Sequence, residues 1–124
     1  TMSCFIGGDN QVIEELCKEF DVDIANLNCP GQTVISGEIS KVQAACQKAA
    51  ALNFKRIVPL NVAGAYHSRL MESARASFEI FLKDISFNKP EITVFTNTTG
   101  KVINDPCAIK AALVQQVVAP VRWE

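Results

Sequence analysis

The sequence has one histidine, no excess of charge of either sign and no long apolar run. Its 12 Lys and Arg are balanced by 13 Asp and Glu, which gives a formal net charge of −1. A nucleic-acid or anionic-membrane partner therefore has no electrostatic support. No apolar stretch approaches the roughly 20 residues of a membrane-spanning helix, and no signal-peptide pattern opens the chain. We expect a cytoplasmic protein, with one domain or one domain plus the beginning of another in its 124 residues.

The cysteines form no metal-binding or redox motif. There are five, an odd number, and no C-x-x-C occurs among them. With a single histidine in the chain, this pattern argues against a zinc site and favours reduced, buried thiols. A thiol–imidazole pair of Cys29 with His67 finds no support in the spacing, and a buried or turn cysteine is the commoner case.

The single histidine, His67, is the first candidate for proton transfer, because imidazole is the one side chain that titrates near neutral pH. It follows an apolar, strand-like run, Ile57 to Val62, and the small residues Ala63-Gly64-Ala65. A helical period of apolar residues begins three residues after it. That pattern comprises Leu70, Met71, Ala74, Phe78, Phe81, Leu82 and Ile85. His67 is therefore predicted at a strand–helix junction, where a histidine that only caps or packs is the default alternative.

The first half of the chain predicts a complete small domain. The expected strands are Met2–Ile6, Val22–Asn28, Thr33–Ser36 and Lys55–Leu60. One expected helix begins after a cap at Asp9 or Asn10, and a second runs from Ile39 to Leu52. Gly7-Gly8 lacks the rest of a phosphate-loop motif and predicts a plain turn. The order strand, helix, strand, strand, helix, strand is the ferredoxin-like arrangement, an antiparallel four-stranded sheet with two helices on one face. We expect it to span residues 1–62.

Residues 63–124 predict part of a larger α/β domain. The helix after His67 leads to a predicted strand, Glu91–Thr96, and to a turn at Thr99-Gly100. Asp105-Pro106 is an N-cap followed by proline at the first helical position, and its helix is expected to run to about Val118. Two helices and one strand bury their apolar faces poorly. The expected fold class is thus α/β (α+β), with the second half open to self-association.

Two asparagines of the second predicted strand need a reason, because asparagine is unfavourable in strands. Alternation places Asn26 and Asn28 on the same side. Turn-capping by Asn28 is one explanation, and hydrogen bonds to a ligand or to a loop near His67 are another. For Asn97-Thr98-Thr99-Gly100 a plain turn is the default.

Four motifs, in order and in register along the chain, resemble malonyl-CoA:acyl carrier protein transacylases. They are Asn-Leu-Asn-Cys-Pro-Gly-Gln-Thr-Val-Ile-Ser-Gly at 26–37, Gly-Ala-Tyr-His-Ser-x-Leu-Met at 64–71, Thr-Asn-x-Thr-Gly at 96–100 and Pro-Val-Arg-Trp at 120–123. The resemblance implies an α/β-hydrolase-like large domain with an inserted ferredoxin-like small domain. It implies transfer of a malonyl group from coenzyme A to the phosphopantetheine of acyl carrier protein in fatty acid biosynthesis, with no permanently bound cofactor and no metal.

The resemblance also implies roles for single residues. His67 would be the catalytic base of a Ser–His pair, and the backbone carbonyl of Gln116 would orient its ring. Asn26 and Asn28 would face the active-site cleft as substrate-binding residues. Tyr66, where the family more often has phenylalanine, would contact the acyl group.

One departure from the family pattern concerns the nucleophile. The family's serine lies on a G-x-S-x-G elbow, and no G-x-S-x-G occurs in these residues. The chain is therefore expected to be an internal segment of about two-fifths of a family member, inactive alone. The alternative is a non-catalytic ferredoxin-like module for ligand binding or regulation. RNA binding would require stacking aromatics and a basic surface, which the predicted strands lack.

Overall fold

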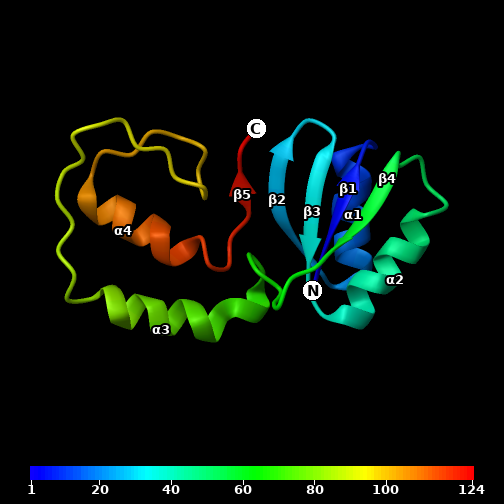
Figure 1. Ribbon diagram of the computed structural model, residues 1–124, viewed down its shortest axis with the longest axis horizontal. Helices are drawn as coiled ribbons and strands as arrows, with labels where there is room; N and C mark the ends of the chain where they lie inside the picture. Colours follow the sequence, from blue (N-terminus) through cyan, green and yellow to red (C-terminus); the bar gives the residue numbers. More distant parts are fainter.

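A five-stranded sheet with two helices forms one side of the molecule, and two further helices with a long loop form the other (Figure 1). The computed structural model describes residues 1–124. The strands are β1 (Met2–Ile6), β2 (Asp23–Cys29), β3 (Gln32–Ser36), β4 (Arg56–Leu60) and β5 (Val121–Arg122). The helices are α1 (Asn10–Phe20), α2 (Ile39–Ala49), α3 (Glu72–Leu82) and α4 (Pro106–Gln115), with a short 3-10 helix, η1 (Arg69–Met71), before α3.

The first four strands have the predicted ferredoxin-like order. The sheet runs β4-β1-β3-β2-β5, and β1 pairs antiparallel with both β3 and β4, as β2 does with β3. Phe5 and Ile35 of the sheet share one buried cluster with Ile13 and Leu16 of α1 and Val42 of α2. Both helices therefore pack on the same face of the sheet, which confirms the predicted α+β fold class.

The fifth strand comes from the other half of the chain and was not predicted. β5 pairs in parallel with β2, Asn26 opposite Val121 and Leu27 opposite Arg122. Two residues carry too little periodicity to predict a strand from sequence. The boundary at residue 62 stays a prediction, although the sheet itself draws on both halves.

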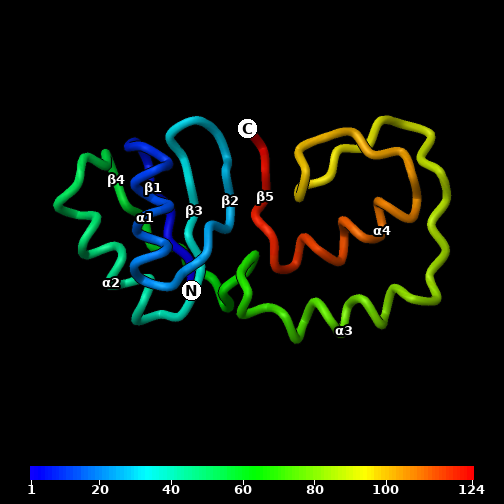
Figure 2. Tube along the Cα trace, turned by 180° about the vertical axis from the view of Figure 1, so that it is seen from behind, coloured from blue at the N-terminus to red at the C-terminus, as the bar shows by residue number.

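The two later helices form as predicted and lie beside each other, as both views show (Figure 2). Asp105 caps α4 by accepting a hydrogen bond from Ala108 N–H at 2.7 Å. The Lys110 ammonium of α4 donates to the carbonyl oxygens of Lys83 and Ile85, 3.0 Å each, at the end of α3. The Lys110 contacts join α4 to the end of α3 through polar groups, while Ile80, Phe81 and Ile85 stay exposed.

The predicted strand Glu91–Thr96 is wrong. The segment forms only an isolated antiparallel bridge, Phe95 opposite Val102, closed by a turn in which Gly100 has φ +62°. Ile92 and Phe95 are 79% and 66% exposed. An apolar run becomes a strand only where it pairs along a neighbouring strand. One backbone hydrogen bond joins this region to the sheet, from Arg122 N–H of β5 to the Asn97 carbonyl oxygen at 2.7 Å. No helix of the chain has both the length and the apolar character to cross a membrane.

Candidate functional site

His67 lies in a tight turn between β4 and η1, in an unusual backbone conformation. Its φ of +57° is in the left-handed region, which costs a residue with a side chain about 1–3 kcal/mol and is often found at functional sites. Ser68 follows, completely buried, and its hydroxyl donates to the carbonyl oxygen of Ala65 at 2.6 Å. Ser68 also caps η1, so His67 directly precedes a helical segment, as predicted.

The His67 ring contacts the backbone carbonyl of Gln116 at the end of α4. The distance from Nδ1 to that oxygen is 2.7 Å. Because a carbonyl oxygen only accepts hydrogen bonds, this contact requires the proton on Nδ1. Nε2 makes no hydrogen bond within the chain. The Asn97 side-chain amide donates to the Gln116 side chain at 3.3 Å, and so ties the 96–100 turn to the same place.

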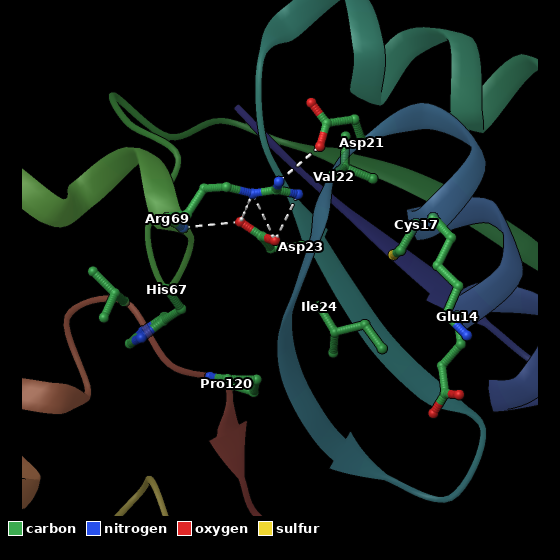
Figure 3. A pocket seen from close by; sticks show the side chains of 11 residues that line it. Glu14, Cys17, Asp21, Val22, Asp23, Ile24, His67, Arg69 and Pro120 are labelled. Carbon is green, nitrogen blue, oxygen red and sulfur yellow. Dashed lines mark hydrogen bonds and ion pairs between the residues drawn. The ribbon is translucent and has the colours of Figure 1, made fainter.

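A cleft of about 630 Å³ opens beside His67. Figure 3 shows His67 and Pro120 on one side of it, and α1 and β2 on the other. Its lining residues are Glu14, Cys17, Lys18, Asp21, Val22, Asp23, Ile24, His67, Arg69, Val118 and Pro120. The cleft is thus lined by apolar side chains and by charged groups of both signs.

An ion pair joins the His67 turn to the sheet. Asp23, the first residue of β2, accepts hydrogen bonds from the backbone N–H of Arg69 at 2.9 Å and from its Nε at 3.1 and 3.2 Å. The Nη1 atom of the same guanidinium lies 2.7 Å from Oδ1 of Asp21. The hydrogen bonds to Asp23 raise the pKa of Arg69. Hydrogen bonding from Lys41, and then the charge of Arg69, lower the pKa of Asp21.

The other predicted site residues make no hydrogen bond to the His67 ring. Asn28 donates from its amide to the side chain of Gln32 at 3.1 Å, across the hairpin. Asn26 lies between β3 and β5 in the sheet. The Tyr66 side chain is 42% exposed and lies beside Gly64. The structure therefore brings together His67 and Gln116, and none of these three residues lines the cleft.

Sequence reasoning missed Asp23 and Arg69. They are 46 positions apart, and no motif or period relates an aspartate at the start of a strand to an arginine after a turn. The nearest available signal was that Arg69 stands two residues after His67 inside a recognised motif.

No hydroxyl or thiol of the chain is placed as a nucleophile for His67. No serine or cysteine hydrogen-bonds to its ring. Cys17 lines the cleft, but burial, with smaller contributions from Asp23 and Glu14, raises its pKa to about 12, so its thiol is protonated at neutral pH. No group of three or more His, Cys, Asp or Glu residues is arranged to hold a metal ion.

Comparison with curated proteins shows a match along almost the whole chain. The malonyl CoA-acyl carrier protein transacylase of Bacillus subtilis is 35% identical over 99% of the chain, and that of Staphylococcus aureus is 30% identical over the same share. The chain spans only 40% and 42% of the lengths of these two relatives. None of the protein-family models that were compared matches the sequence.

Solved structures show the same similarity. An acyl carrier protein S-malonyltransferase from Vibrio cholerae superposes with a TM-score of 0.93 at 34% identity, over 98% of this chain and 41% of that one. A type II PKS acyl-carrier protein in complex with its malonyl-transacylase gives a TM-score of 0.93 at 38% identity, with 98% and 41% covered. In sequence and in fold, the chain is thus similar over nearly its full length to about two-fifths of a malonyl-CoA:acyl carrier protein transacylase, which confirms the resemblance predicted from its motifs.

Proposed function

We propose that the protein containing this chain transfers a malonyl group from coenzyme A to acyl carrier protein, with His67 as general base. The contact that carries the proposal is the 2.7 Å hydrogen bond between Nδ1 of His67 and the Gln116 carbonyl. It keeps the proton on Nδ1 and leaves the lone pair on Nε2 free to accept one. The similarity to malonyl transacylases supplies the substrate class.

In this mechanism His67 works twice. Nε2 takes the proton of a serine hydroxyl as the oxygen attacks the malonyl thioester, and backbone N–H groups stabilise the tetrahedral oxyanion. The thioester bond breaks, coenzyme A leaves with the proton from His67, and a malonyl-serine remains. The phosphopantetheine thiol of the carrier protein then attacks this ester and gives its proton to His67. The ester bond breaks, the serine oxygen takes that proton, and the malonyl group remains on the carrier protein as a thioester. The serine must come from outside these 124 residues, since they hold no G-x-S-x-G.

The ferredoxin-like half would cover the cleft from above and present its polar groups to the substrate. We propose that Asn26 and Asn28 face the acyl group in the complete protein and that Tyr66 limits its size. In this chain Asn28 bonds to Gln32, and neither asparagine reaches the cleft beside His67. These three roles are therefore supported by the family motifs alone.

The test uses the longest open reading frame that contains this sequence. The purified protein is incubated with radiolabelled malonyl-CoA, and covalent label is followed on a denaturing gel before and after holo acyl carrier protein is added. We expect a labelled protein whose label passes to the carrier protein. Tight binding of malonyl-CoA without any covalent label would instead support the ligand-binding module.

A further inference from the structure

Strand β2, which lies between β3 and β5, contacts the segments that follow His67 and Gln116 in the chain. Through Asp23 at its start, β2 binds the backbone N–H and the guanidinium of Arg69, two residues after His67. Figure 3 shows the Asp23 carboxylate facing Arg69 beside the His67 turn. An exposed ion pair is usually weak, but this fork uses both carboxylate oxygens and also holds the main chain of the turn.

The same strand places the carbonyl partner. β5 pairs with β2, and the backbone N–H of Trp123 also donates to the carbonyl oxygen of Leu27 at 2.9 Å. β5 begins five residues after Gln116, so its position on β2 limits where the end of α4 can lie. The His67 ring and the Gln116 carbonyl come from segments 49 positions apart. The chain that follows each of them is bound to the same strand, β2.

We propose that Asp23 is a positioning residue for His67. Its carboxylate holds the turn in the left-handed conformation in which Nδ1 reaches the Gln116 carbonyl, so that a single tautomer, with Nε2 unprotonated, is kept. A hydrogen bond of this length tolerates displacements of only a few tenths of an ångström. The importance of this tautomer for catalysis rests on the proposed function, since only a base needs a free Nε2.

The single histidine makes this inference testable on the 124-residue chain itself. In a sample labelled with ¹⁵N at histidine, the two ring nitrogens of His67 are the only imidazole signals. Magic-angle-spinning NMR, at a pH at which the ring is neutral, distinguishes the protonated nitrogen from the unprotonated one at any particle mass. The wild type should show a single state with the proton on Nδ1.

Asp23→Ala should lose this single state, and a second set of signals with the proton on Nε2 should appear. The matched control is Glu79→Gln, which removes a carboxylate from an ion pair with Arg75 on α3, away from the cleft, and should leave the wild-type spectrum unchanged. A single Nδ1–H state in Asp23→Ala, with the circular dichroism of the wild type, would overturn the proposal.

If Asp23→Ala does not fold, Asp23→Val decides in the same way, because valine removes both carboxylate acceptors and favours the strand conformation at this position. Two tautomers in this variant support the proposal, and one refutes it. The readout involves no malonyl chemistry. A complete protein without malonyl transfer would therefore refute the proposed function, and an unchanged tautomer would refute only the role of Asp23.

Discussion

The two halves of the chain differ in how they bury apolar side chains. Residues 1–62 close a core in which Phe5, Ile35 and Ala45 are fully buried. In residues 63–124 the buried apolar side chains are Ala65, Leu82, Val114 and Val121. Large apolar side chains are instead exposed there, and they are Tyr66, Leu70, Ile80, Phe81, Ile85, Ile92, Phe95, Val102 and Trp123. Helices and caps can thus form locally in a segment whose apolar side chains have no other part of the chain to pack against.

The exposed apolar surface of the second half predicts the largest effect, a change in mass. Contiguous exposed apolar patches seek partners, so the isolated chain should scatter light as particles heavier than its 13.5 kDa. Replacing Ile80 and Phe81 by serine should reduce that mass, because these side chains are 74% and 67% exposed. A wild-type monomer with slowly exchanging amides in α3 and α4 would contradict this expectation.

Truncation of a core side chain in the first half should lower the free energy of unfolding far more than truncation of an exposed side chain in the second half. Phe5 is fully buried and meets the Phe54 ring edge-to-face, with centroids 5.1 Å apart. Phe5→Ala should lower the free energy of unfolding of the first half by about 3–5 kcal/mol. Phe81→Ala, at an exposed site, should change it by less than about 0.5 kcal/mol. Urea titrations followed by circular dichroism measure both, and equal losses would mean that Phe81 is buried in solution as Phe5 is.

Residue 66 should affect the choice of acyl group in the complete protein. An aromatic side chain there should occupy the space of an α-methyl group, so we expect a preference for malonyl over methylmalonyl thioesters, which Tyr66→Ser weakens. Discrimination of one methyl-sized group is worth only about 1–3 kcal/mol, so some methylmalonyl transfer is expected.

Competition between the two thioesters measures this preference. Ile39→Ser, an exposed change on α2, is the control. Equal turnover of both thioesters by the wild type would refute the steric argument. The Tyr66 ring does not line the cleft in this chain. The result therefore also decides whether the Tyr66 side chain faces the acyl group in the complete protein.

The cap of α4 should give the smallest effect. Asp105 accepts from Ala108 N–H at 2.7 Å, and loss of an N-cap of this kind costs about 0.5–2 kcal/mol. Asp105→Ala should therefore reduce amide protection in α4, measured by hydrogen exchange, and leave α1 unchanged. Asp105→Asn retains a capping oxygen and should retain most of the protection. Equal protection in the alanine variant would show that contacts with α3, rather than the cap, hold the helix.

The features predicted from sequence are those that local chemistry determines. Asp9 and Asp105 cap helices because a short acceptor side chain meets free N–H groups within three residues. The four-strand order followed from the alternation of complete elements. By contrast, the apolar run at 91–96 could not be distinguished from a strand without knowing whether it pairs along a neighbouring strand. The two residues of β5 form a strand through pairing with β2, which lies in the other half of the chain.

The site divides in the same way. His67 stood out because it is the only histidine, and Gln116 was identified only through the family resemblance. The bond between them spans 49 positions, and the fork between Asp23 and Arg69 spans 46. Long-range polar contacts of this kind leave no periodic trace in a sequence, so only the structure shows them.

The central claim is that His67 is the base of malonyl transfer, and the most direct measurement is the transfer rate of the complete protein with and without this ring. His67→Asn is the most suitable variant, because asparagine tolerates the left-handed backbone at this position but cannot act as a base. With circular dichroism unchanged, malonyl transfer to holo acyl carrier protein should fall by roughly two to four powers of ten. Transfer at the wild-type rate would remove His67 from the mechanism.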